Sequence, residues 1–75
     1  MTEISKDKLI DELAKSVGME AAKQVVEDAM KELGITGDTL NKEDAVKVCR
    51  VLTKKEDIVA IAARVLLAKI YLSSL

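Results

Sequence analysis

The stretch from Ile58 to Leu75, IVAIAARVLLAKIYLSSL, decides the fold. It lacks Gly and Pro, and few polar residues interrupt it, so it predicts one helix about 27 Å long. A helix that packs on one side has an apolar sector a little over about 100° wide. This segment is apolar around most of its circumference and therefore needs neighbours on more than one side. Its large apolar side chains fall into two groups: Ile58, Ile61, Val65 and Leu72 on one side, and Val59, Ala63, Leu66 and Ile70 on another.

Such a helix points to self-association. Three shorter helices can cover only part of it, and a large exposed aliphatic surface favours aggregation. We therefore expect a two-fold homodimer that buries the spare face. A monomer with this helix at its centre is the alternative, whereas a membrane anchor would place Arg64 and Lys69 near the bilayer centre. Periodicity does not separate core from interface within the candidate set of Ile58, Ile61, Val65, Leu66, Ile70 and Leu72.

Three further helices are predicted upstream. The first follows a cap at Ser5 and stops at Gly18, and the second runs from Met19 to a left-handed stop at Gly34. A third follows a cap at Asn41, after a loop over residues 36–40 that Leu40 pins by pointing inward. The sequence Thr53-Lys54-Lys55-Glu56 matches a capping box, so the fourth helix is predicted to begin there. With no strand alternation, residues 1–75 are expected to form a single all-α domain, a four-helix bundle with short loops.

The second helix is predicted to be amphipathic. Acidic and basic residues occupy one side of it, including Glu27 and Lys31 four residues apart in the favourable order. The opposite side is an apolar stripe made of Met19, Ala22, Val26, Ala29, Met30 and Leu33, with Val25 beside it.

Composition excludes several chemistries. The chain has 75 residues, with 12 Lys and Arg, 13 Asp and Glu, one Cys and no His. These counts rule out a Ser-His-Asp triad, a His-containing zinc site and an internal disulfide. We find no catalytic, cofactor-binding or metal-ligating set and expect a non-enzymatic protein that interacts with its own copy or with another protein.

The single thiol and the N-terminal sequence bear on location. Cys49 falls on the apolar side of the third predicted helix, where a buried thiol acts as a small hydrophobic group. The N-terminus lacks the apolar segment of a signal peptide, so a cytoplasmic protein is expected. Lys and Glu are abundant while Asn and Gln occur once each, a bias compatible with a thermophilic source.

A basic cluster on the third helix leaves a second function open. Lys47, Arg50 and Lys54 recur at three- and four-residue spacing, and Lys55 follows. These four residues are candidate contacts for a polyanion, and a dimer would double the cluster. The alternative function is therefore a small nucleic-acid-binding regulator, although the formal net charge of −1 provides no overall basic field.

The segment from Leu13 to Met19 resembles the turn of a helix-turn-helix motif, with Ala14 followed four residues later by Gly18. The helix that would read DNA exposes Glu20, Glu27 and Asp28, which would repel phosphates. We therefore interpret the segment as a tight turn between two antiparallel helices.

Overall fold

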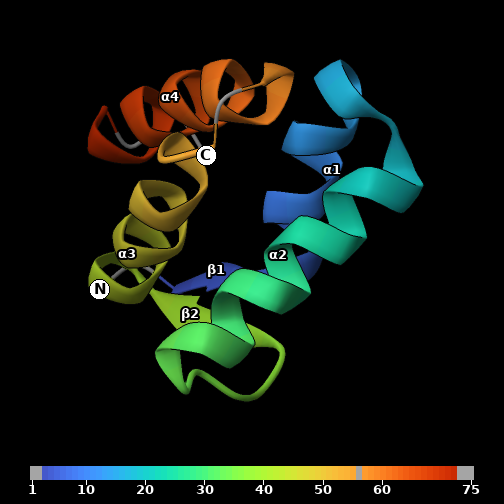
Figure 1. The fold of residues 1–75 in the computed structure, drawn as a ribbon. Helices are drawn as coiled ribbons and strands as arrows, with labels where there is room; N and C mark the ends of the chain where they lie inside the picture. The colour runs from blue at the N-terminus through green and yellow to red at the C-terminus, as the bar shows by residue number, and fades with distance from the viewer. Residues whose placement is uncertain (1–2, 56, 73–75) are drawn as a thin grey trace.

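The described residues of the chain fold into four helices and a two-stranded ribbon. The structure is a computed structural model that describes residues 3–55 and 57–72. In chain order, its elements are β1 (Glu3–Ser5), α1 (Lys6–Val17), α2 (Met19–Leu33), β2 (Thr39–Asn41), α3 (Lys42–Thr53) and α4 (Ile58–Tyr71). The helices α1 and α2 pack on each other, and α4 lies across α3 and α1 (Figure 1).

The first two helices begin and end where the sequence predicts, and the third begins where it predicts. The Ser5 hydroxyl accepts a hydrogen bond from the Lys8 amide at 3.0 Å, and the Asn41 side chain accepts one from the Asp44 amide at 2.7 Å. Both contacts satisfy amides that have no partner inside the helix. Gly34 adopts the left-handed conformation at φ 71°, and the Ile35 amide then donates to the Met30 carbonyl at 2.8 Å. This is the Gly stop with a following hydrophobic residue that the sequence indicates.

The prediction that the fourth helix begins at Thr53 is wrong. Thr53 is the last residue of α3, and its hydroxyl donates to the Arg50 carbonyl at 2.8 Å. Asp57 caps α4 instead, because its carboxylate accepts a hydrogen bond from the Val59 amide at 3.0 Å. As a result α4 is a helix of 14 residues rather than the longer one expected. Residue 56 and residues 73–75, which complete the predicted box and helix, lie outside the described residues.

The expected four helices are present, but the fold is not purely helical because it also contains a two-stranded ribbon. The strands β1 and β2 pair antiparallel, with Glu3 opposite Asn41 and Ile4 opposite Leu40. Ile4 and Leu40 are both buried, so Leu40 does pin the loop as predicted. Each strand has three residues and points one side chain inward, which is too short for an alternating pattern to be visible in the sequence. The ribbon joins the start of α1 to the start of α3.

The core is formed by one side of each helix. Leu9 and Leu13 of α1, Val26 of α2 and Leu52 of α3 are fully buried. The apolar stripe of α2 is buried in its middle and exposed at its ends, where Met19 is 55% exposed and Leu33 36% exposed. These two residues begin and end the helix, where neighbouring elements no longer cover it.

Candidate functional site

The two sides of α4 have different environments. The side facing α1 and α3 is buried and includes Leu66 and Ile70, each 2% exposed. The other side carries Ile58, Ile61, Val65 and Leu72, which are 54%, 65%, 55% and 76% exposed. The structure thus divides the predicted set: Leu66 and Ile70 belong to the core, and the other four residues lie on the surface.

The exposed apolar residues of α4 form a narrow line. Together with exposed Ala68, which the sequence analysis did not select, they make the α4 stripe: Ile58, Ile61, Val65, Ala68 and Leu72. Their spacing alternates between three and four residues, and at 100° per residue they fall within a sector of about 80°. This spacing is typical of the seam between two paired helices. Five of the large hydrophobic residues exposed in the described chain belong to α4 or its C-terminal cap.

Charged groups border the α4 stripe on both sides. On the α3 side, the exposed residues Asp57, Arg64 and Tyr71 follow one another at intervals of seven. Arg50 of α3 reaches this edge, because its Nη2 donates to the Tyr71 hydroxyl at 3.3 Å. On the α1 side, Lys69 Nζ lies 2.7 Å from a carboxylate oxygen of Glu12. The α4 stripe is therefore bordered on both sides by polar groups that contacts with α3 and α1 hold in position.

The basic cluster predicted on the third helix lies on the surface. Lys47, Arg50, Lys54 and Lys55 are all exposed; Lys47 and Arg50 lie on one side of α3, and Lys54 is its C-terminal cap. Exposed Glu43 lies on the same side one turn before Lys47, which lowers the local positive charge. All four predicted cations are therefore accessible to solvent, and Arg50 contacts α4 through Tyr71.

Cys49 is buried on α3, as its position in the sequence predicts. Its side chain is 0% exposed, and desolvation raises the pKa of the thiol from 9.0 to about 12. A thiol of this kind stays protonated at neutral pH, so it lacks the thiolate that nucleophilic chemistry requires.

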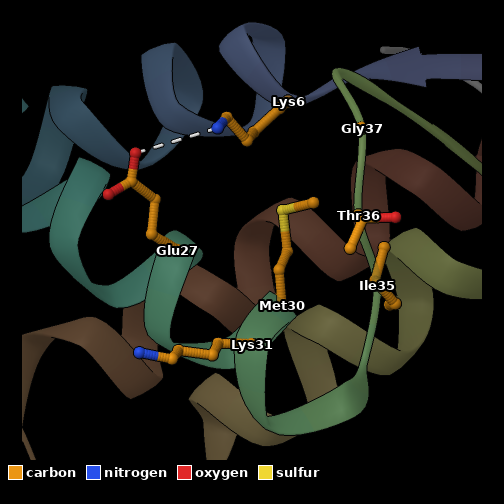
Figure 2. A pocket seen from close by; sticks show the side chains of 7 residues that line it. All are labelled: Lys6, Glu27, Met30, Lys31, Ile35, Thr36 and Gly37. Carbon is orange, nitrogen blue, oxygen red and sulfur yellow. Dashed lines mark ion pairs between the residues drawn. The ribbon is translucent and has the colours of Figure 1, made fainter.

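A shallow pocket lies between the start of α1, the end of α2 and the loop that follows (Figure 2). Its volume is about 340 Å³, and Met30 and Ile35 supply its apolar wall. Lys6 and Glu27 form an ion pair across it at 3.7 Å, and the Thr36 hydroxyl points away from Met30 (Figure 2). A neighbouring groove of about 530 Å³ shares Lys6 and Glu27. Over residues 3–55 and 57–72, His, Cys, Asp and Glu do not come together in a group that could hold a metal ion.

Comparison of the chain with protein-family models, with curated proteins and with solved structures finds no match. No helix within the described ranges combines the length and the apolar character needed to cross a membrane. Among the surfaces described above, the α4 stripe is the most unusual for a small folded chain, because large aliphatic side chains are concentrated on one line rather than scattered.

Proposed function

We propose that the protein is a non-enzymatic interaction module that forms a homodimer through the α4 stripe. The observation that carries the proposal is the alignment of Ile58, Ile61, Val65 and Leu72, each more than half exposed, along one side of α4. Burying apolar surface contributes about 25 cal/mol per Å², and elsewhere in residues 3–55 and 57–72 the exposed large hydrophobic residues form no comparable line.

A second copy of the chain is a suitable occupant for the α4 stripe. A two-fold axis brings the same surface of two copies together, and a straight apolar line is complementary to itself under that operation. The spacing of three and four residues allows side chains from two helices to interlock. A stable interface buries about 800 Å² per partner, so Tyr71 and the edge residues from α1 and α3 are expected to contribute as well.

The test is to place a charge on the α4 stripe. Wild-type protein at tens of micromolar should show about twice the chain mass of 8.2 kDa by size-exclusion chromatography with light scattering. The Val65→Glu variant should remain helical by circular dichroism and run as a monomer, because its side chain is 55% exposed and not part of the core. The Ile61→Glu variant should behave in the same way.

The matched control is Met19→Glu. Met19 is also 55% exposed but lies on α2, away from the α4 stripe, so this variant should stay dimeric. Leu66→Glu should unfold the protein, because Leu66 is 2% exposed. A monomeric wild type, or a Val65→Glu variant of unchanged mass, would overturn the proposal.

The alternative function is binding of a nucleic acid by the basic cluster. It is favoured by the exposure of Lys47 and Arg50 on α3 and of Lys54 at its C-terminal cap. The contact between Arg50 and Tyr71 sets this cluster beside the α4 stripe, so a dimer would bring two clusters to the same region of the assembly.

A further inference from the structure

We infer that the second copy binds with its α4 antiparallel to the first, in the register that sets Ile58 against the partner's Ala68 and Ile61 against the partner's Val65. This inference rests on the proposed homodimer and adds its orientation, its register and the charged pair that selects them.

The charges beside the α4 stripe disfavour a parallel pair. In a parallel pair of helices, a residue on one edge lies near the residue five positions later on the opposite edge of the partner. Arg64 on the α3 side would then approach the partner's Lys69, and the two-fold symmetry would repeat this contact. Lys69 lies 2.7 Å from the Glu12 carboxylate, so Glu12 already pairs within its own chain and is not free to pair with the partner's Arg64. Like charges brought together in this way oppose association.

An antiparallel pair brings equivalent edges together. In the proposed register, Asp57 at the start of one α4 faces the partner's Tyr71 at the end of the other. The Arg50 guanidinium lies beside the Tyr71 hydroxyl at 3.3 Å, so Asp57 also meets the partner's Arg50. One carboxylate oxygen of Asp57 accepts the hydrogen bond from the Val59 amide. The other oxygen can accept a hydrogen bond from the partner's Arg50. The symmetry makes two such contacts, one at each end of the interface.

The same register fits the sizes of the side chains. Ala68 is the smallest member of the α4 stripe, and it leaves room for the partner's Ile58. At the centre, Arg64 approaches the partner's Arg64 once, at an exposed edge, whereas a parallel pair would bring Arg64 and Lys69 together twice. If the partner helix slides by seven residues so that Ile61 faces the partner's Leu72, Asp57 lies past the partner's Tyr71 and loses this contact. If it slides by seven residues in the opposite direction, mainly Ile58 and Ile61 remain in contact.

Cysteine crosslinking tests the orientation. The Ile58→Cys and Ala68→Cys variants are purified separately, mixed and oxidised, and the products are identified by mass spectrometry. The mixture should form an intermolecular disulfide between the two variants. Each variant alone should crosslink at least tenfold more slowly, because like positions lie about 15 Å apart along the helix axis in this register. Wild-type protein is the background control, since Cys49 is buried.

The outcomes separate the inference from the proposed function. Rapid self-crosslinking of each variant would indicate a parallel pair and overturn the inference. Preferential crosslinking of Ile61→Cys with Leu72→Cys would indicate the shifted register and also overturn it. If wild type is dimeric by light scattering but the Cys variants form none of these disulfides, the interface lies elsewhere, and both the register and the α4 stripe as interface are overturned. A monomeric wild type would overturn the proposed homodimer itself.

A charge experiment tests the contact that selects the register. Asp57→Asn keeps a side-chain oxygen for the cap to Val59 and removes the charge, so it should raise the dimer Kd about two- to fivefold. Arg50→Gln should have a similar effect, and the double variant should be no worse than either single variant. Glu43→Gln, which changes another exposed charge on α3, should leave the Kd unchanged. Additive effects of the two single variants would show that Asp57 and Arg50 do not meet.

Discussion

Lys69 of α4 lies 2.7 Å from Glu12 of α1, measured from Nζ to Oε1, and this contact joins the last helix of the chain to the first. Lys15 lies 3.0 Å from the other oxygen of the same carboxylate. The hydrogen bond from Lys69, followed by that from Lys15, lowers the pKa of Glu12 from 4.5 to about 2. The packing of α4 on α1 is therefore coupled to the ionisation of one side chain.

Glu12 should make the protein sensitive to acid between pH 4.5 and about pH 2. Its pKa is lower in the folded state, so its stabilisation is complete above the unfolded pKa and is lost as the pH falls through the folded one. Glu12→Gln should lower the free energy of unfolding by about 1 kcal/mol at pH 7, and by much less near pH 2. Urea denaturation at both pH values measures this, with Glu32→Gln on the surface of α2 as the control. An equal loss at both pH values would contradict it.

The two sides of α4 should differ in their contribution to folding. Leu66→Ala should lower the free energy of unfolding by about 2–5 kcal/mol, because it leaves a cavity among fully packed residues. Leu72→Ala should change it by less than about 0.5 kcal/mol, because Leu72 is 76% exposed. Both are to be measured by urea denaturation in the Val65→Glu background, so that folding of one chain is compared without assembly. Similar losses for the two variants would show that α4 is not divided in this way.

Cys49 should be unreactive in the folded protein. Burial keeps a reagent from reaching the Cys49 thiol and raises the pKa of the thiol to about 12. At pH 7–8 the thiol is therefore both inaccessible and protonated. A chromogenic disulfide reagent should modify the thiol rapidly in 8 M urea and slowly in buffer. The additional thiol of Ala21→Cys, at an exposed position of α2 outside the α4 stripe, provides the fast reference. Rapid modification of native wild type would show that α3 opens readily.

The basic cluster should bind nucleic acid too weakly to be detected at 50 mM salt. Glu43 lies on the same side of α3, and the formal net charge of the chain is −1. Fluorescence anisotropy with labelled duplex DNA and RNA measures this, and a variant with Lys47, Arg50 and Lys54 all changed to Gln is the control. Saturable binding that falls steeply with salt and is lost in that variant would favour the alternative function.

Local chemistry alone was enough to predict much of the chain. The caps at Ser5 and Asn41 and the stop at Gly34 depend on side chains and backbone within one turn, so the sequence contains them in full. The burial of Cys49 and Leu40 likewise follows from their place among apolar neighbours. The start of α4 was predicted wrongly because Thr53 and Asp57 can both cap a helix, and the hydroxyl of Thr53 bonds back to Arg50 instead.

Other features were decided by contacts between distant segments. The β1–β2 ribbon pairs residues 3–5 with residues 39–41, and strands of this length leave no periodic pattern in the sequence. The sequence showed that α4 is apolar on more than one side, but α1 and α3 determine that Leu66 and Ile70 are covered while Ile61 and Val65 are not. Periodicity reports the angle between residues on a helix and contains no information about which direction its neighbours come from. The edges of the α4 stripe have the same origin, because Arg50 meets Tyr71 and Glu12 meets Lys69 only once the helices are packed.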